Sequence, residues 1–332
     1  MTAVDGPEAA TAPGAPARTT AGPAVPGAVG AAGGPAAAGV GGAATRAAGG
    51  PAATAAGGPA GDRLGDRLAR FSFNQATATG WGLEELVAGC MAAGVPGVGL
   101  WREPVREYGV ERAARLVREA GLAVTSLCRG GFFTADGWRD ENLRAIEEAA
   151  ALGTRELVLV SGGLPAGSRD VDAARERVAD AIGELVPHAR AAGVRLAIEP
   201  LHPMFCADRC VISTLGQALD IAERFDPGAV GVVVDTYHLW WDDTVFRQIA
   251  RAGDRIAAFQ VADWVTPLPA GVLLGRALPG EGCVDLRRFR DAVDAAGYRG
   301  AIEVEVFDAD LWARPGPEIL AAAITAHLTH VA

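Results

Sequence analysis

The chain has 332 residues, half of them apolar, and a formal net charge of -10 at pH 7. This acidic balance argues against nucleic acid as a partner, because a protein that binds nucleic acid needs a basic face against the phosphates. No run of about 18 apolar residues is free of charged ones, so the sequence predicts no membrane-spanning segment. The length suffices for a large core, and α/β barrels of about 250 residues form a single domain.

The first 62 residues consist almost entirely of Ala, Gly, Pro and Thr. A segment without large apolar side chains cannot offset the entropy lost on ordering, so we expect a disordered tail over residues 1–62. Its start, MTAVDGPEAATAPG, has neither a basic region nor an apolar block, which argues against a secretory signal. The chain has five cysteines, an odd number, and their spacing does not repeat, so we expect reduced thiols in a cytoplasmic protein.

Short apolar runs alternate with amphipathic stretches after Arg67. Eight such runs predict β-strands, and they cover residues 70–76, 97–101, 123–128, 156–162, 195–200, 230–235, 256–263 and 301–307. The stretches between them carry apolar residues at i, i+3 and i+4 and end on glycine, which is typical of helices. The clearest of these predicted helices cover residues 83–94, 110–121 and 173–193.

Eight consecutive β–α units predict a (β/α)₈ TIM barrel over residues 67–332. An open, doubly wound sheet is the alternative fold for such an alternation. It is disfavoured because no Gly-x-Gly-x-x-Gly turn follows the first predicted strand.

Polar side chains gather at the predicted C-terminal ends of the last four strands, where barrel enzymes carry their working residues. They are Glu199 and His202, Asp235 and His238, Gln260 and Asp263, and Glu303 and Glu305. Carboxylates crowded at low dielectric repel one another and take up protons unless a cation lies among them. Oxygen-rich ligands favour Mn²⁺, with Mg²⁺ and Co²⁺ as alternatives.

Each of these residues also has a purely structural interpretation. Asp235 alone is typical of a helix N-cap, Glu199 alone of an ion pair with an arginine, and Gln260 alone of a buried amide bonded to backbone. Single histidines are most often satisfied polar groups. The tryptophans Trp101 and Trp264, with Trp240 or Trp241, are most often packing residues, although they could also offer flat apolar surface to a sugar. The joint occurrence of oxygen donors on four neighbouring strands favours a site.

The chain from about Arg70 to its end resembles the xylose-isomerase-like TIM barrels, which include sugar phosphate isomerases/epimerases, ketose 3-epimerases and inosose dehydratases. The matching segments are, in order, IEPLHP, VVDTYH, FQVAD, LPGEGCVD and YRGAIEVEVF. The resemblance implies that the metal ligands are Glu199, Asp235, Gln260 and Glu305. The chain departs from the family pattern at Gln260, where the usual ligand is histidine, and at His202, where the family has asparagine. Endonuclease IV-like members need more histidines than the five present here, which argues against DNA repair.

The predicted function is a metal-dependent isomerase or epimerase of a sugar or keto-sugar. A divalent ion that bridges a carbonyl oxygen and the neighbouring hydroxyl acidifies the adjacent C–H bond. The resemblance implies that Glu199 and Glu305 serve both as ligands and as the acid/base pair that moves the proton through an enediolate. His202, an imidazole in place of asparagine, adds a further catalytic candidate.

Substrate-binding roles are predicted for His238, Arg276, Arg129, Trp101 and Trp264, with a small carbohydrate as the substrate. Two alternatives stay open. The first is a lyase, either an inosose-type dehydratase or an enzyme that eliminates the aglycone of a 3-keto-glycoside. The second is a non-catalytic barrel that binds sugar or supports a partner subunit. Assembly into a homo-oligomer is expected only by analogy with the family.

Overall fold

The computed structural model describes residues 65, 67–269 and 272–332, which all belong to one structural unit. The predicted disordered tail over residues 1–62 lies outside the described residues. None of the described helices combines the length and the apolar character needed to cross a membrane. All five cysteines are described, and all are unpaired thiols, as predicted.

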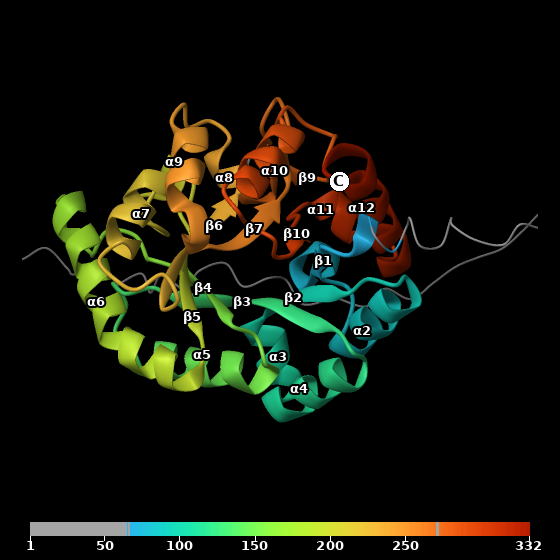
Figure 1. The fold of residues 1–332 in the computed structure, drawn as a ribbon, viewed down its shortest axis with the longest axis horizontal. Helices are drawn as coiled ribbons and strands as arrows, with labels where there is room; N and C mark the ends of the chain where they lie inside the picture. Colours follow the sequence, from blue (N-terminus) through green and yellow to red (C-terminus); the bar gives the residue numbers. More distant parts are fainter. Residues whose placement is uncertain (1–64, 66, 270–271) are drawn as a thin grey trace, which may run out of the picture. The chain divides into compact units, whose positions relative to one another are not determined.

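Eight parallel strands form a closed barrel in the order β1-β10-β7-β6-β5-β4-β3-β2 (Figure 1). The strands are β1 (Phe71–Asn74), β2 (Gly97–Trp101), β3 (Ala123–Gly131), β4 (Glu156–Val160), β5 (Arg195–Ile198), β6 (Val230–Asp235), β7 (Ile256–Val261) and β10 (Ile302–Val304). Seven of the eight predicted runs contain one strand each, and the run over residues 123–128 forms the first part of the longer β3, so the predicted TIM barrel is confirmed. Two short strands, β8 (Asp263–Trp264) and β9 (Arg276–Ala277), pair in antiparallel fashion beyond the end of β7.

Helices surround the barrel strands (Figure 1). They are α2 (Leu83–Ala92), α3 (Arg102–Tyr108), α4 (Val110–Glu119), α5 (Trp138–Leu152), α6 (Val171–Ala192), α7 (Leu215–Ala222), α8 (Thr236–Leu239), α9 (Val245–Ala252), α10 (Leu286–Ala295), α11 (Ala309–Trp312) and α12 (Gly316–His330). Short 3₁₀ helices are η1 (Gln75–Ala78), η2 (Pro203–Phe205), η3 (Gly253–Arg255) and η4 (Val272–Leu274). The three predicted helices are confirmed as α2, α4 and α6, and α6 begins two residues early because Asp170 caps it.

The barrel strands are buried on both faces and therefore separate two apolar regions. The outward side chains pack against the helices in one large cluster. The interior holds a small cluster of mostly short side chains, which are Cys128, Val158, Ala197, Val233, Ala257 and Ala258. Because side chains alternate along a strand, the next inward position on β5, β6 and β7 lies one layer nearer the C-terminal end. That layer carries the polar residues.

Candidate active site

The alternation along three strands brings the predicted polar residues into the barrel mouth. Glu199 follows Ala197 by two positions, Asp235 follows Val233, and Gln260 follows Ala258, so each points inward above a small apolar residue. All three are buried, and Asp235 and Gln260 pair directly in the register of β6 and β7. Glu305 comes directly after β10 and is buried as well.

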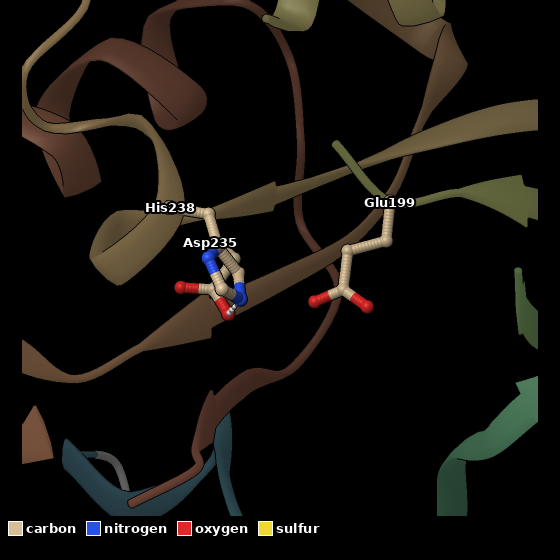
Figure 2. Close-up of side chains that lie close together, drawn as sticks. All are labelled: Glu199, Asp235 and His238. Carbon is tan, nitrogen blue, oxygen red and sulfur yellow. Dashed lines mark ion pairs between the residues drawn. The ribbon is translucent and has the colours of Figure 1, made fainter. Parts of the chain in front are cut away.

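Ligand atoms of Glu199, Asp235 and His238 lie within 4.8 Å of one another. Figure 2 shows the Glu199 carboxylate, which enters from the end of β5, pointing toward Asp235 and His238 at the junction of β6 and α8. Asp235 also caps α8, since its Oδ1 accepts the backbone N–H of Tyr237 at 2.7 Å. The cap thus uses Oδ1, and the other oxygen, Oδ2, lies 3.4 Å from Nη1 of Arg276.

His238 cannot offer a free nitrogen lone pair to a cation in this arrangement. Its Nδ1 lies 3.2 Å from the backbone nitrogen of His202, and its Nε2 lies 3.1 Å from Nη2 of Arg276. A neutral imidazole accepts at one nitrogen and carries a proton on the other, so Nε2 is either protonated or engaged by the guanidinium. Burial, followed by the charge of Arg276, holds the pKa of His238 well below its usual value, so the ring is neutral. This favours the predicted substrate-binding role over a ligand role.

Arg276 is a buried guanidinium at the centre of this cluster. Its Nη1 lies 2.8 Å from Oε2 of Glu305 and 3.4 Å from Oδ2 of Asp235. The guanidinium carbon is 4.8 Å from the ring centroid of Tyr237 and 4.5 Å from that of Phe307. These two rings and two carboxylates hold the guanidinium in place within the cluster.

Burial and mutual repulsion perturb the three carboxyls. Burial, with the charges of Glu305 and Asp235, raises the pKa of Glu199 well above its usual value. Burial also raises the pKa of Asp235, although Arg276 opposes the shift. For Glu305, burial raises the pKa to about 7, again against Arg276. Each carboxyl is therefore held in an environment that disfavours its charge.

The donor set fits a divalent cation. Three carboxylates against one buried guanidinium leave two negative charges without a buried counterion. Within the described part of the chain, Glu199 forms no ion pair, and the buried oxygens Gln260 Oε1 and Glu305 Oε1 have no hydrogen-bond partner. Buried acceptors without partners are rare in native proteins unless an ion or water meets them. Glu199, Asp235, Gln260 and Glu305 are thus the residues that could hold a cation, and their oxygen donors suit Mg²⁺ or Mn²⁺.

Asp263 organises the loop that returns Arg276 to the site. Its Oδ1 accepts the backbone N–H groups of Trp264 and Val284, both at 2.9 Å, and its Oδ2 accepts that of Gly280 at 2.9 Å. Trp264 pairs with Arg276 in the β8–β9 ladder. Asp263 therefore anchors both ends of the segment that positions the guanidinium, and it is not itself within the carboxylate cluster.

Aromatic side chains enclose His202 beside the cluster. The centroid of its ring lies 5.1 Å from that of Trp264 and 5.4 Å from that of Trp241. Burial lowers its pKa, so the ring is neutral near pH 7. Its Nδ1 accepts the backbone N–H of Met204 at 3.3 Å, which leaves Nε2–H as a donor. Trp264 is buried and packs against other rings, in accord with the structural interpretation of the tryptophans.

Arg129 and Arg209 are cations without carboxylate partners among the described residues. Arg129 lies near the C-terminal end of β3, with its guanidinium carbon 5.5 Å from the ring centroid of Trp101 and 4.8 Å from that of Phe132. The buried Nε of Arg209 has no hydrogen-bond partner in the described chain. Burial and the charge of Arg129 lower the pKa of Arg209. The charge of Arg129 also opposes the rise in the pKa of Glu199.

Sequence reasoning missed the residues beneath the cluster. Asn74, Thr125 and Ser126 all donate hydrogen bonds to Glu303 in the barrel interior. The available signal was the polar residues inside the first and third predicted strands, FSFN and VTSL, where barrel strands normally carry apolar ones. Arg209 was also missed, because it lies in a loop without periodicity.

Comparisons with known proteins agree with the fold. A profile described as "Xylose isomerase-like TIM barrel" matches residues 87–326. The chain is 46% identical to protein SMc04130 from Sinorhizobium meliloti, whose crystal structure superposes with a TM-score of 0.77 over 80% of this chain and 99% of that one. A crystal structure of the IolI protein with a bound zinc atom is 21% identical, with a TM-score of 0.68 over 79% of this chain and 98% of that one.

Two curated enzymes are similar in sequence. A 3-dehydroshikimate dehydratase from Pseudomonas aeruginosa is 32% identical over 249 residues, which is 70% of this chain and 37% of that protein. An inosose isomerase from Halalkalibacterium halodurans is 29% identical over 127 residues, which is 37% of this chain and 43% of that protein. The chain thus spans well under half the length of these curated relatives.

Proposed function

Because the chain belongs to the xylose isomerase-like TIM barrel family, we propose that it is a divalent-cation-dependent enzyme that isomerises or epimerises a small sugar or keto-sugar. The observation that carries this proposal is the set of buried oxygen donors at the barrel mouth, Glu199, Asp235, Gln260 and Glu305, in which Gln260 Oε1 and Glu305 Oε1 have no hydrogen-bond partner among the described residues. The zinc atom in the related IolI structure supports a divalent ion in this fold, although the oxygen donors here favour Mn²⁺.

The bound cation would polarise the substrate carbonyl and so acidify the neighbouring C–H bond. Glu199 and Glu305 then act as the acid/base pair that removes the proton and returns it. They come from β5 and β10, with β6 and β7 between them in the barrel order, so they approach a substrate from different directions. His238 and Arg276 hold substrate oxygens, and Trp101 and Trp264 flank the sugar ring.

A deuterium-exchange experiment tests this function. The full chain is loaded with Mn²⁺ and incubated with candidate ketoses and aldoses in D₂O, and products are followed by NMR. Isomerase or epimerase activity places deuterium on the carbon next to the carbonyl and leaves the rest of the mass unchanged. The same protein stripped of metal, and a Glu305→Gln variant, serve as controls that should show no incorporation. Absence of incorporation with every substrate class would contradict the proposal.

A dehydratase is the second candidate, because the same proton abstraction can be followed by loss of a hydroxyl β to the carbonyl. Two observations favour it. The P. aeruginosa dehydratase matches 70% of the chain, and Arg129 and Arg209 are cations without carboxylate partners in the described residues, which suits a substrate with its own carboxylate. His202 Nε2–H could assist the leaving hydroxyl. In the NMR experiment, hydroxylated keto acids would then yield an unsaturated product and water.

A further inference from the structure

Glu303 lies one layer below the ligand cluster, two residues before Glu305 on the same side of β10. Its carboxylate is buried and forms no ion pair with any described residue. It instead accepts hydrogen bonds from four side chains, Asn74 (2.6 Å), Thr125 (2.8 Å), Ser126 (2.9 Å) and Gln260 (3.0 Å). Gly99 makes room for it, since a Cβ at that position would overlap Oε1 of Glu303.

The orientation of the Gln260 amide follows from this network. Asn74 Oδ1 accepts the backbone N–H of Ala76 at 2.9 Å and the indole Nε1–H of Trp101 at 3.0 Å, so the NH₂ group of Asn74 must face Oε1 of Glu303. That same Oε1 lies 3.0 Å from the Gln260 amide. An oxygen that already accepts from Asn74 would repel the amide oxygen of Gln260. The NH₂ group of Gln260 therefore faces Glu303, and its oxygen is turned away.

The oxygen that is turned away has no partner in the described part of the chain. Gln260 Oε1 is buried, as is the unpartnered Oε1 of Glu305. Gln260 pairs in register with Asp235 on one side and with Glu303 on the other. An amide held by one neighbour and aligned with the other presents a preoriented neutral oxygen beside the carboxylate cluster.

We propose that Glu303 is a positioning residue that holds the Gln260 oxygen toward the ligand cluster and so tunes the site to the oxygen-preferring cations Mg²⁺ and Mn²⁺ over Zn²⁺. This inference rests on the proposed cation site. An amide oxygen is a harder ligand than an imidazole nitrogen, which suits zinc better. Loss of a residue that orients a ligand typically weakens metal binding 10- to 100-fold.

The test measures metal affinity directly in the full-length chain. Isothermal titration calorimetry with Mn²⁺, and competition with Zn²⁺, give the affinity and the number of ions bound. We expect Glu303→Leu to weaken Mn²⁺ binding at least 10-fold, because Gln260 is no longer held. Glu303→Gln keeps an oxygen for Asn74 and Gln260, so it should stay within about threefold of wild type. Ser126→Ala removes another donor to Glu303 without touching Gln260 and is the matched control, also within about threefold.

Two further variants keep the test decisive. If Glu303→Leu does not fold by circular dichroism, Glu303→Asp keeps the charge but withdraws it by one methylene from Gln260, and the same loss is expected. Gln260→His should raise the ratio of Zn²⁺ to Mn²⁺ affinity at least 10-fold. Mn²⁺ binding that survives loss of Glu303, or an unchanged ratio in Gln260→His, overturns this inference alone. Failure of wild type to bind any divalent ion overturns the proposed function as well.

Discussion

Replacement of Arg276 by methionine should destabilise the cation-free protein strongly. Arg276 is 3% exposed, so solvent cannot replace its guanidinium beside Glu305 and Asp235. Methionine resembles the aliphatic part of the arginine side chain in length and removes the charge. Removing one partner of a buried ion pair typically costs about 3–5 kcal/mol. For a domain of this size, a loss of about 3 kcal/mol lowers the melting temperature by roughly 6–12 °C.

The assay is thermal unfolding in the presence of a chelator, at pH 8 and at pH 5. The loss should be smaller at pH 5, because Glu305, with a pKa of about 7, is then protonated and needs no counterion. Arg251→Met is the matched control. It breaks ion pairs to Asp220 (2.8 Å) and Glu223 (2.6 Å) at the surface, where we expect less than about 1 kcal/mol. Equal losses in the two variants, or no dependence on pH for Arg276→Met, would refute the burial argument.

Further predictions concern other parts of the barrel. Glu199→Gln should lower turnover by at least about 10³-fold and yet stabilise the cation-free protein by about 1–3 kcal/mol in denaturant titrations. It removes a buried carboxyl whose charged form is disfavoured and has no ion-pair partner among the described residues. Asp263→Ala should cost about 3 kcal/mol and raise KM, since three backbone N–H groups lose their acceptor, whereas Asp263→Asn should lose about a third of that. Burial and the charge of Arg290 lower the pKa of His327 to about 4, so the folded chain binds fewer protons than the unfolded chain between about pH 6.5 and 4. Stability should therefore fall by about 3 kcal/mol as the pH drops through that window, and His327→Phe should abolish this part of the pH dependence, whereas an unchanged profile would assign it to other groups.

The barrel was predictable because each strand has a recognisable local sequence pattern. A run such as VGVVVD is too short and too β-branched for a helix, and a glycine-terminated amphipathic stretch follows or precedes most runs. Once eight runs are counted, closure into a barrel follows from the parallel β–α alternation. Inward projection of Glu199, Asp235 and Gln260 at one level then follows from a period of two along each strand.

The contacts of Arg276 and Glu303 were not predictable in the same way. Arg276 reaches Glu305 because β9 pairs in antiparallel fashion with β8, and because Asp263 accepts hydrogen bonds from the loop that follows β9. The periodicity of apolar residues does not predict such a pairing. Glu303 depends on Asn74 and Gly99, some two hundred residues away in sequence. Among the described residues the partners of Glu303 are neutral donors, and no spacing along the chain indicates them.

The first turn of α8 begins on the same side chain that faces the proposed cation site. An asparagine at position 235 would start that turn equally well, because an amide oxygen caps a helix as effectively as a carboxylate. Exchange of Oδ2 for an NH₂ group would therefore remove one proposed cation ligand and keep the hydrogen bond that starts the helix. Screens that measure only yield or solubility would score such a variant as intact. The proposed activity can therefore be lost by substitution while the fold is kept.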